Sequence, residues 1–163
     1  TKPPANAALW VAAGAVPALI TRLGDFDVDL LQVLACSCLA HLMSQDMDAA
    51  EQAVEGGLDA LQKVLEGDNP RLHWLAAKTL GAADRTDELQ ARITANPRVL
   101  ERLDEIAASA EKTEAEMPEA SMREMSGRVR VLVGMTAAKL RIPHAEQDKL
   151  RLLEQAQMMK PPQ

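Results

Sequence analysis

The chain has 163 residues and a formal net charge of −6, and 47% of it is hydrophobic although it contains one Phe, two Trp and no Tyr. A core of Ala, Leu, Val, Ile and Met favours close helix packing over a β-sandwich, so we expect one all-α domain over residues 1–163. Three basic and nine acidic side chains lie in the segment 1–66, and the rest of the chain holds fifteen of each. The sequence supplies no net positive face, so we expect no nucleic-acid partner.

The longest apolar stretch, residues 7–20, is too short to cross a bilayer and is interrupted by Gly14 and Pro17, so we expect no membrane span. Cys36 and Cys38 point in different directions on a helix and cannot pair with each other, which excludes a disulfide framework. A reducing compartment is compatible with this, either the cytoplasm or an organelle interior after removal of a transit peptide. The sequence leaves the localisation open.

The N-terminal part of the chain predicts three helices. A short first helix carries Trp10, which we expect to pack onto the core. The second helix has apolar residues at the i, i+3, i+4 and i+7 positions of one face, namely Val16, Leu19, Ile20 and Leu23. A third and longer helix is predicted over residues 29–43. Together they form a first unit over residues 5–44.

A second unit, residues 45–84, has the same pattern. A short helix over residues 47–55 is predicted to end at Gly56-Gly57, because Gly tolerates the left-handed turn that follows a helix. The next helix repeats the apolar spacing with Leu58, Leu61, Val64 and Leu65. The third helix is predicted over residues 71–83.

A third unit spans residues 85–142 and departs from the pattern. A short helix over residues 86–95 ends at Asn96-Pro97, since the residue before Pro leaves the α region. The acidic segment 109–121 is interpreted as an inserted exposed linker or as a helix extension that ends before Pro118. A helix over residues 122–140 follows, and an amphipathic helix within residues 144–159 is expected to cap the last open face.

Apolar positions recur at one constant spacing in the three units: Val16, Leu58 and Leu100, then Leu19, Leu61 and Leu103, then Leu23, Leu65 and Ala107. A period of this length indicates a helical solenoid in which each unit buries its apolar face against the next. In its repeat segments, "AAGAVPALITRL", "AVEGGLDALQKVLEGDNPRLHWLAAKTLGAA" and "DELQARITANPRVLERL", the chain resembles armadillo-repeat proteins. The resemblance implies a right-handed solenoid of about three repeats whose third helices line a concave, protein-binding groove.

A second resemblance is to the armadillo domain of nucleotide-exchange factors for seventy-kilodalton heat-shock chaperones. It is carried by Asp46, Asp48, Gly56, Gly57, Ala76, Ala77, Leu80 and Gly81. Ala49 and Lys78 depart from that family, which often has Asn and Trp there. The chain is unlike nuclear-import receptors, because His41 and Ala82 stand where the armadillo proteins that read import signals carry Asn.

Armadillo geometry implies a groove-facing stripe on the third helices, and from it we take a candidate partner-binding set. Its members are Ser37, His41, Trp74, Lys78 and Arg130. Trp74 is either a groove anchor or a side chain packed between repeats.

The sequence offers little for catalysis or metal binding. Cys38 and His41 lie three apart on one helix face, but a zinc site needs three or four ligands and nothing fixes Asp46 or Asp48 near them. A packed Cys beside a partly exposed His is the simpler interpretation. His73 and His144 stand next to helix starts, where a surface role is expected. We therefore expect no catalytic residues, metal, cofactor or small-molecule substrate.

Two functional hypotheses follow. The first is a non-enzymatic module that binds a partner protein through the concave face, with a chaperone nucleotide-exchange factor as its most specific form. The alternative is a small structural accessory subunit of a large multiprotein assembly, suggested by the small number of repeats and by methionines crowded into the C-terminal third.

Overall fold

The computed structural model describes residues 6–24, 29–116 and 120–158, and the side chains of residues 6–24, 29–112 and 123–152. The described chain consists of helices and short connections with no strand, which confirms the all-α prediction. The helices are α1 (Asn6–Ala12), α2 (Ala15–Leu23), α3 (Asp29–Gln45), α4 (Met47–Glu66), α5 (Pro70–Ala83), α6 (Asp87–Thr94), α7 (Pro97–Glu116), α8 (Ala120–Lys139) and α9 (His144–Met158).

Short polar side chains fix the starts of the central helices. Asp46 accepts a hydrogen bond from the Ala49 backbone N–H at 3.0 Å and caps α4. Asn69 and Thr86 cap α5 and α6 in the same manner. These contacts satisfy donors that the first turn of a helix leaves unpaired. They explain why the predicted starts of these helices are correct to within a residue.

Gly56 and Gly57 do not end a helix, so the prediction of two separate helices in the second unit is wrong. Both lie inside α4, which runs unbroken from Met47 to Glu66. Within the described chain only Gly14 has a positive φ, at 81°, and it separates α1 from α2. Gly57 is buried against Ile20 of α2, where a β-carbon would approach the Ile20 side chain to 3.2 Å. Gly57 therefore allows α2 and α4 to approach closely instead of forming a turn.

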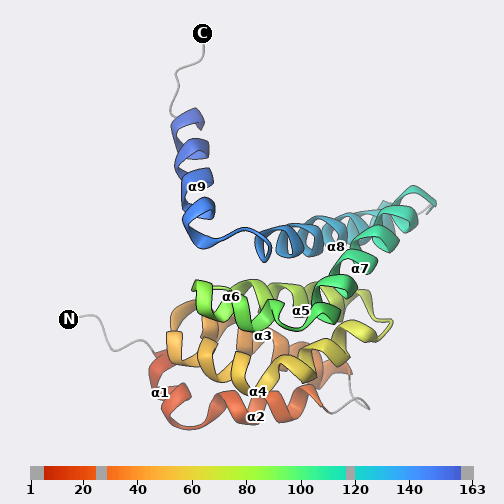
Figure 1. The fold of residues 1–163 in the computed structure, drawn as a ribbon. Helices are drawn as coiled ribbons and strands as arrows, with labels where there is room; N and C mark the ends of the chain where they lie inside the picture. Colours follow the sequence, from red (N-terminus) through yellow and green to blue (C-terminus); the bar gives the residue numbers. More distant parts are fainter. Residues whose placement is uncertain (1–5, 25–28, 117–119, 159–163) are drawn as a thin grey trace.

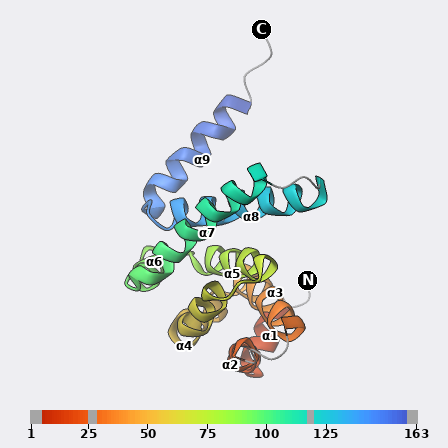
Figure 2. The same cartoon turned by 90° about the vertical axis from the view of Figure 1, so that its right-hand side faces the viewer.

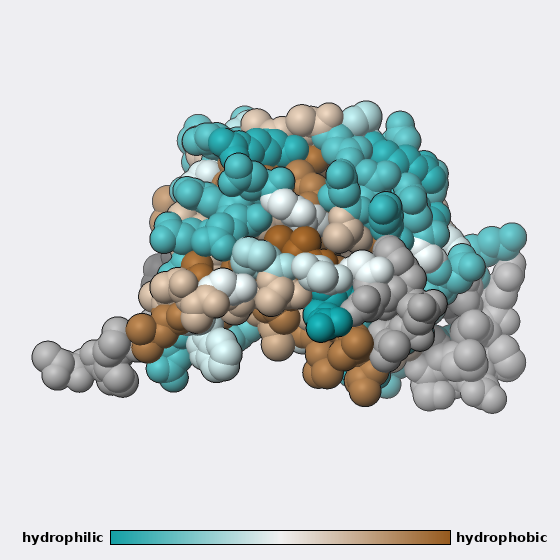
Figure 3. All heavy atoms as spheres, turned by 90° about the horizontal axis from the view of Figure 1, so that it is seen from below, coloured by the Kyte–Doolittle hydropathy of each residue, from teal (hydrophilic) through white to brown (hydrophobic). Residues whose placement is uncertain are grey.

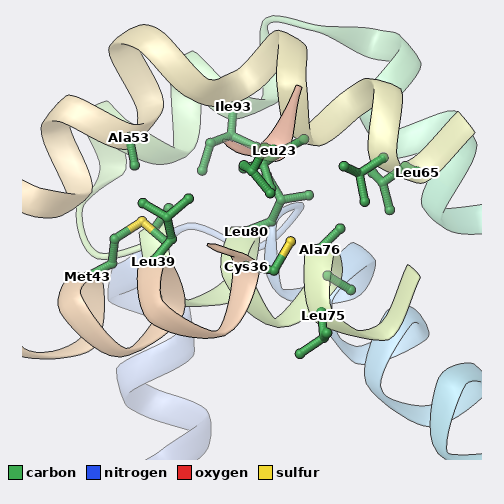
Figure 4. Close-up of a cluster of buried hydrophobic side chains, with 14 of the residues drawn as sticks. Leu23, Cys36, Leu39, Met43, Ala53, Leu65, Leu75, Ala76, Leu80 and Ile93 are labelled. Carbon is green, nitrogen blue, oxygen red and sulfur yellow. The ribbon is translucent and has the colours of Figure 1, made fainter. Parts of the chain in front are cut away.

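The helices lie in two neighbouring rows. In one row α2 packs on α4 and α4 on α7; in the other, α3 packs on α5 and α5 on α8 (Figures 1 and 2). One continuous core fills the space where the rows meet (Figure 4). It holds fully buried side chains from α2 to α6, among them Leu23, Leu39, Leu65, Leu80 and Ile93. A buried Leu or Ile contributes about 1.5–3 kcal/mol, so this seam accounts for much of the stability.

The acidic segment 109–121 is not a free linker over its described part. Helix α7 continues to Glu116, which fits the alternative of a helix extension, and α8 begins at Ala120. The two helices lie side by side and reach past the other helices, at the right of Figure 1. Pro118 lies outside the described residues. The extension therefore lengthens a helical hairpin.

The prediction that the last helix caps an open face is wrong for the described part of α9. This helix projects away from the two rows (Figure 1), and Leu150 and Leu152 are exposed by 49% and 65%. Its start is held by Asp87, whose carboxylate accepts a hydrogen bond from the His144 backbone N–H at 3.0 Å. Gln147 is buried and donates to the carbonyls of Lys139 and Ile142. These hydrogen bonds hold the elbow between α8 and α9, whereas Leu150 and Leu152 beyond it are exposed.

The N-terminal end also differs from expectation. Trp10 is 63% exposed and does not attach α1 to the core; Ala7 and Val11 do so instead. In the described segments no single helix has the length and apolar composition needed to cross a membrane. Taken together, α1 and α2 meet both criteria, but the two helices are bent by 75° relative to each other.

Candidate partner-binding surface

Four of the five residues predicted to bind a partner divide between two separate hollows, and the fifth, Lys78, contacts Trp74 beside the second. Ser37 and His41 line the first, which we call the N-terminal hollow and which has a volume of about 740 Å³. Helices α1, α2 and α3 supply its walls, and most of its lining is small or apolar, including Ala7, Trp10, Ala15, Ala18, Leu19 and Leu42. Seen from the side of α1 and α2, hydrophobic atoms gather toward the lower edge of the molecule, whereas hydrophilic atoms dominate the upper half (Figure 3).

Polar side chains in the N-terminal hollow are engaged locally. The Ser37 hydroxyl donates to the Val33 carbonyl at 2.8 Å within α3. The His41 ring lies 3.1 Å from the Gln45 amide nitrogen on the next turn, and His41 is exposed. Both side chains are exposed and can reach a partner at the surface.

Trp74 and Arg130 line the second hollow, which we call the α5–α8 groove and which has a volume of about 1010 Å³. Its apolar lining is Trp74 from α5 together with Val131, Leu132 and Met135 from α8. Val131 is 49% exposed and Met135 is 64% exposed. Trp74 is partly buried: it lines the groove and also packs against the core.

Charged side chains around the groove are mostly basic. Arg123, Arg128 and Arg130 line it, and Glu124 is the acidic residue of the lining. Glu124 accepts a hydrogen bond from Arg128 at 2.6 Å. Lys78, the fifth predicted residue, is exposed, and its ammonium lies 5.4 Å from the centroid of the Trp74 ring, a cation–π contact. The groove thus combines an apolar floor with a positive rim.

The apolar side chains Val131 and Met135 were not among the residues predicted to bind a partner. Helical spacing in the segment 122–140 predicts a buried stripe of Val129, Leu132, Val133, Thr136, Ala137 and Leu140. All of these are buried except Leu132, which is partly buried and lines the groove. Val131 and Met135 lie one turn apart on a different face. Large apolar residues outside a helix's buried stripe are the signal that would have found this groove.

His73 is buried, so the expectation of a surface role is wrong. Its Nε2 donates to the Gly67 carbonyl oxygen at 2.6 Å, and Arg102 donates to the Leu65 carbonyl at 2.8 Å. Together they satisfy carbonyls at the end of α4. Loss of hydration on burial lowers the pKa of His73, while its bond to Gly67 acts in the opposite direction. These contacts give His73 a structural role.

A second cluster, not predicted from the sequence, centres on Asp84, whose side chain is fully buried. One carboxylate oxygen lies 2.9 Å from Nε2 of His144, and the other lies 3.3 Å from the Lys139 ammonium. The second contact lacks hydrogen-bond geometry, so we treat it as a purely ionic pair. The Lys139 ammonium donates instead to the carbonyls of Gly81 and Asp84, both at 3.3 Å. This cluster ties the end of α5 to the elbow between α8 and α9.

The cysteines differ sharply in environment. Cys36 is fully buried, and desolvation raises the pKa of its thiol to about 12. Cys38 is exposed in the N-terminal hollow, which corrects the interpretation of a packed side chain. Across the part of the chain with a described structure, no three His, Cys, Asp or Glu residues are arranged to hold a metal. Asp46, considered with Cys38 and His41, is occupied as the cap of α4.

Comparison with known proteins finds no matching protein-family model, no matching curated protein and no matching solved structure. The surface residues of this chain therefore carry the functional inference.

Proposed function

We propose that this protein is a non-enzymatic interaction module that binds another protein through the surface of α3, α5 and α8. The observation that carries the proposal is the α5–α8 groove, in which the exposed Val131 and Met135 lie beside Trp74. Contiguous exposed apolar side chains within a polar surface are typical of binding sites, and Trp is a frequent anchor. The α5–α8 groove has a larger volume than the N-terminal hollow, and we regard the hollow as a secondary contact region.

We propose that the helices form about three armadillo-like repeats in a right-handed solenoid, with boundaries near residues 5–44, 45–84 and 85–142. Two features support this arrangement. The rows α2–α4–α7 and α3–α5–α8 follow the order in which successive repeats stack. Val16, Leu58 and Leu100, which hold equivalent positions in the three units, lie on the three helices of one row and belong to or pack against one core.

The more specific function, nucleotide exchange on a heat-shock chaperone, has weaker support. Asp46 caps α4, Gly57 accommodates Ile20, and Ala76, Ala77 and Leu80 are buried. Residues needed for helix packing account for this resemblance, so it supports the repeat class more than the exchange activity. Measuring the rate of nucleotide release from a seventy-kilodalton heat-shock chaperone with and without this protein tests it, and an unchanged rate removes it.

Site-specific photo-crosslinking tests the binding proposal. A photoreactive amino acid at Met135 should crosslink to one discrete partner in an extract of the native source, and the same group at Arg92 on α6 should not. Arg92 is a suitable control because its side chain is half exposed and lies outside the groove. Trp74→Ala should remove the product from position 135. Equal crosslinking from both positions, or a product that persists without Trp74, would refute the proposal.

The alternative, a structural accessory subunit, is favoured by one further observation. Apolar side chains are exposed at both ends of the structure, with Leu9 and Trp10 on α1 and Leu150 and Leu152 on α9. A permanently bound subunit would cover such surfaces. The subunit hypothesis predicts co-purification with an assembly in a fixed ratio, and elution of the native protein as a free monomer contradicts it.

A further inference from the structure

The α5–α8 groove carries a charge opposite in sign to that of the whole chain. The chain has a formal net charge of −6. Among the residues whose side chains the structure describes, however, the groove is lined by Arg123, Arg128, Arg130 and Glu124, which pairs with Arg128, and Lys78 lies next to Trp74. A rim of this sign on an acidic protein does not follow from average composition. The local positive charge is complementary to a binding partner that carries negative charge.

We propose that the α5–α8 groove binds a segment of a partner protein that carries acidic residues beside a large apolar side chain. The inference rests on the proposed function and names the chemistry of its partner. The apolar side chain would contact Trp74, Val131 and Met135, and the acidic residues would face the arginines of the rim. Arginine suits this task because its guanidinium can donate two parallel hydrogen bonds to one carboxylate.

Two other occupants fit the observations less well. A nucleic acid would also meet the arginines, and its bases could stack on Trp74. Its phosphates, however, would approach a protein with a net charge of −6. The exposed Val131 and Met135 are apolar and provide no charged contact for a phosphate backbone. A second copy of this chain could offer its acidic segment 1–66, and self-association is therefore measured as a separate outcome.

Arg128 and Arg92 provide a matched pair of variants. Each is an exposed arginine paired with the glutamate four residues earlier, at 2.6 Å for Arg128 and Glu124 and at 2.9 Å for Arg92 and Glu88. Changing either to Glu breaks one such pair and places two like charges four residues apart on a helix. The two variants therefore remove the same kind of exposed pair, but only Arg128 lines the groove.

The experiment measures fluorescence anisotropy of labelled peptides added to the full chain. The probe alternates Glu with Leu and Phe; one control peptide replaces every Glu by Lys, and another replaces Leu and Phe by Ser. We expect the probe to bind at least about tenfold more tightly than either control. Arg128→Glu and Trp74→Ala should each weaken binding several-fold, whereas Arg92→Glu should leave it unchanged. Affinity should also fall as salt is raised, because salt screens exposed charges.

Several results would overturn the inference. They are equal or tighter binding of the Lys peptide, equal losses from Arg128→Glu and Arg92→Glu, and no binding of the probe. Tighter binding of oligothymidylate than of the probe would indicate a nucleic-acid site. A concentration-dependent mass abolished by Arg128→Glu would assign the groove to a second copy. If the crosslink at position 135 still depends on Trp74 while the charge variants have no effect, the proposed function stands and only the partner chemistry is wrong.

Discussion

Gly56 and Gly57 lie in the middle of α4 with different surroundings, so Ala at each position should have a different effect on stability. Replacing Gly by Ala inside a helix adds about 0.8–1 kcal/mol to the free energy of unfolding when the new methyl group has room. At Gly56 the methyl carbon would lie 3.7 Å from the Ile20 side chain, an ordinary contact. We therefore expect Gly56→Ala to stabilise the protein by about 1 kcal/mol.

At Gly57 the same methyl carbon would lie 3.2 Å and 3.3 Å from two carbons of Ile20. Ile20 must then shift, and a side chain forced from its preferred rotamer costs about 0.5–1.5 kcal/mol. This cost offsets the gain in helix propensity, so Gly57→Ala should change stability by less than about 0.5 kcal/mol in either direction. In an Ile20→Ala background the obstacle is absent, and Gly57→Ala should again stabilise by about 1 kcal/mol.

Urea unfolding followed by circular dichroism measures the free energy of unfolding of each variant. Equal effects of the two alanines, or no coupling between Gly57 and Ile20, would refute the close approach of α2 and α4. A marked loss of stability from Gly56→Ala would refute the continuous helix, because Ala destabilises a position that needs a left-handed backbone.

Three further predictions concern the polar and thiol groups. Cys38 should react rapidly with a thiol reagent at neutral pH, while Cys36, with a pKa of about 12, should react only on unfolding; mass spectrometry of the labelled peptides distinguishes them. Folding lowers the pKa of His73 below its ordinary value of 6.5, so the unfolded chain binds the extra proton and stability should fall as the pH drops below about 6.5; urea midpoints measured against pH should show this fall, and His73→Gln should reduce it. Asp84→Ala should lower the free energy of unfolding, measured in urea, by about 1–3 kcal/mol, because it removes the buried partner of Lys139 and His144. Asp104→Ala removes an exposed pair with Arg141 and should lower it by less than about 1 kcal/mol. Equal losses from the two variants would contradict the buried role of Asp84.

The helical class and most helix boundaries could be predicted because their signals are local. Asn96-Pro97 and the cap Thr86 act within a few residues of the chain. The Gly56-Gly57 prediction failed because the decisive contact, with Ile20, comes from a residue far away in the sequence. A glycine pair indicates a turn or a close helix contact, and only packing decides between them.

The candidate site could be predicted only in part, because some of its features depend on contacts between residues far apart in the sequence. Trp74 was identified because aromatic residues are scarce, and the groove places it beside Arg130. The hollow that includes Ser37 and His41 is separate, since α1 and α2 complete it. The Asp84 cluster could not be anticipated, because it joins residues more than fifty positions apart.

The elbow at His144 determines where the exposed leucines of α9 point. A helix of 15 residues is about 22 Å long, so a rotation of about 10° at its base displaces its far end by about 4 Å. The short contacts of Asp84 and Asp87 with His144 lie at that base. Helix α9 is thus oriented by the contacts that Asp84 and Asp87 make with His144, and a local change in the packing of these residues would displace Leu150 and Leu152 together.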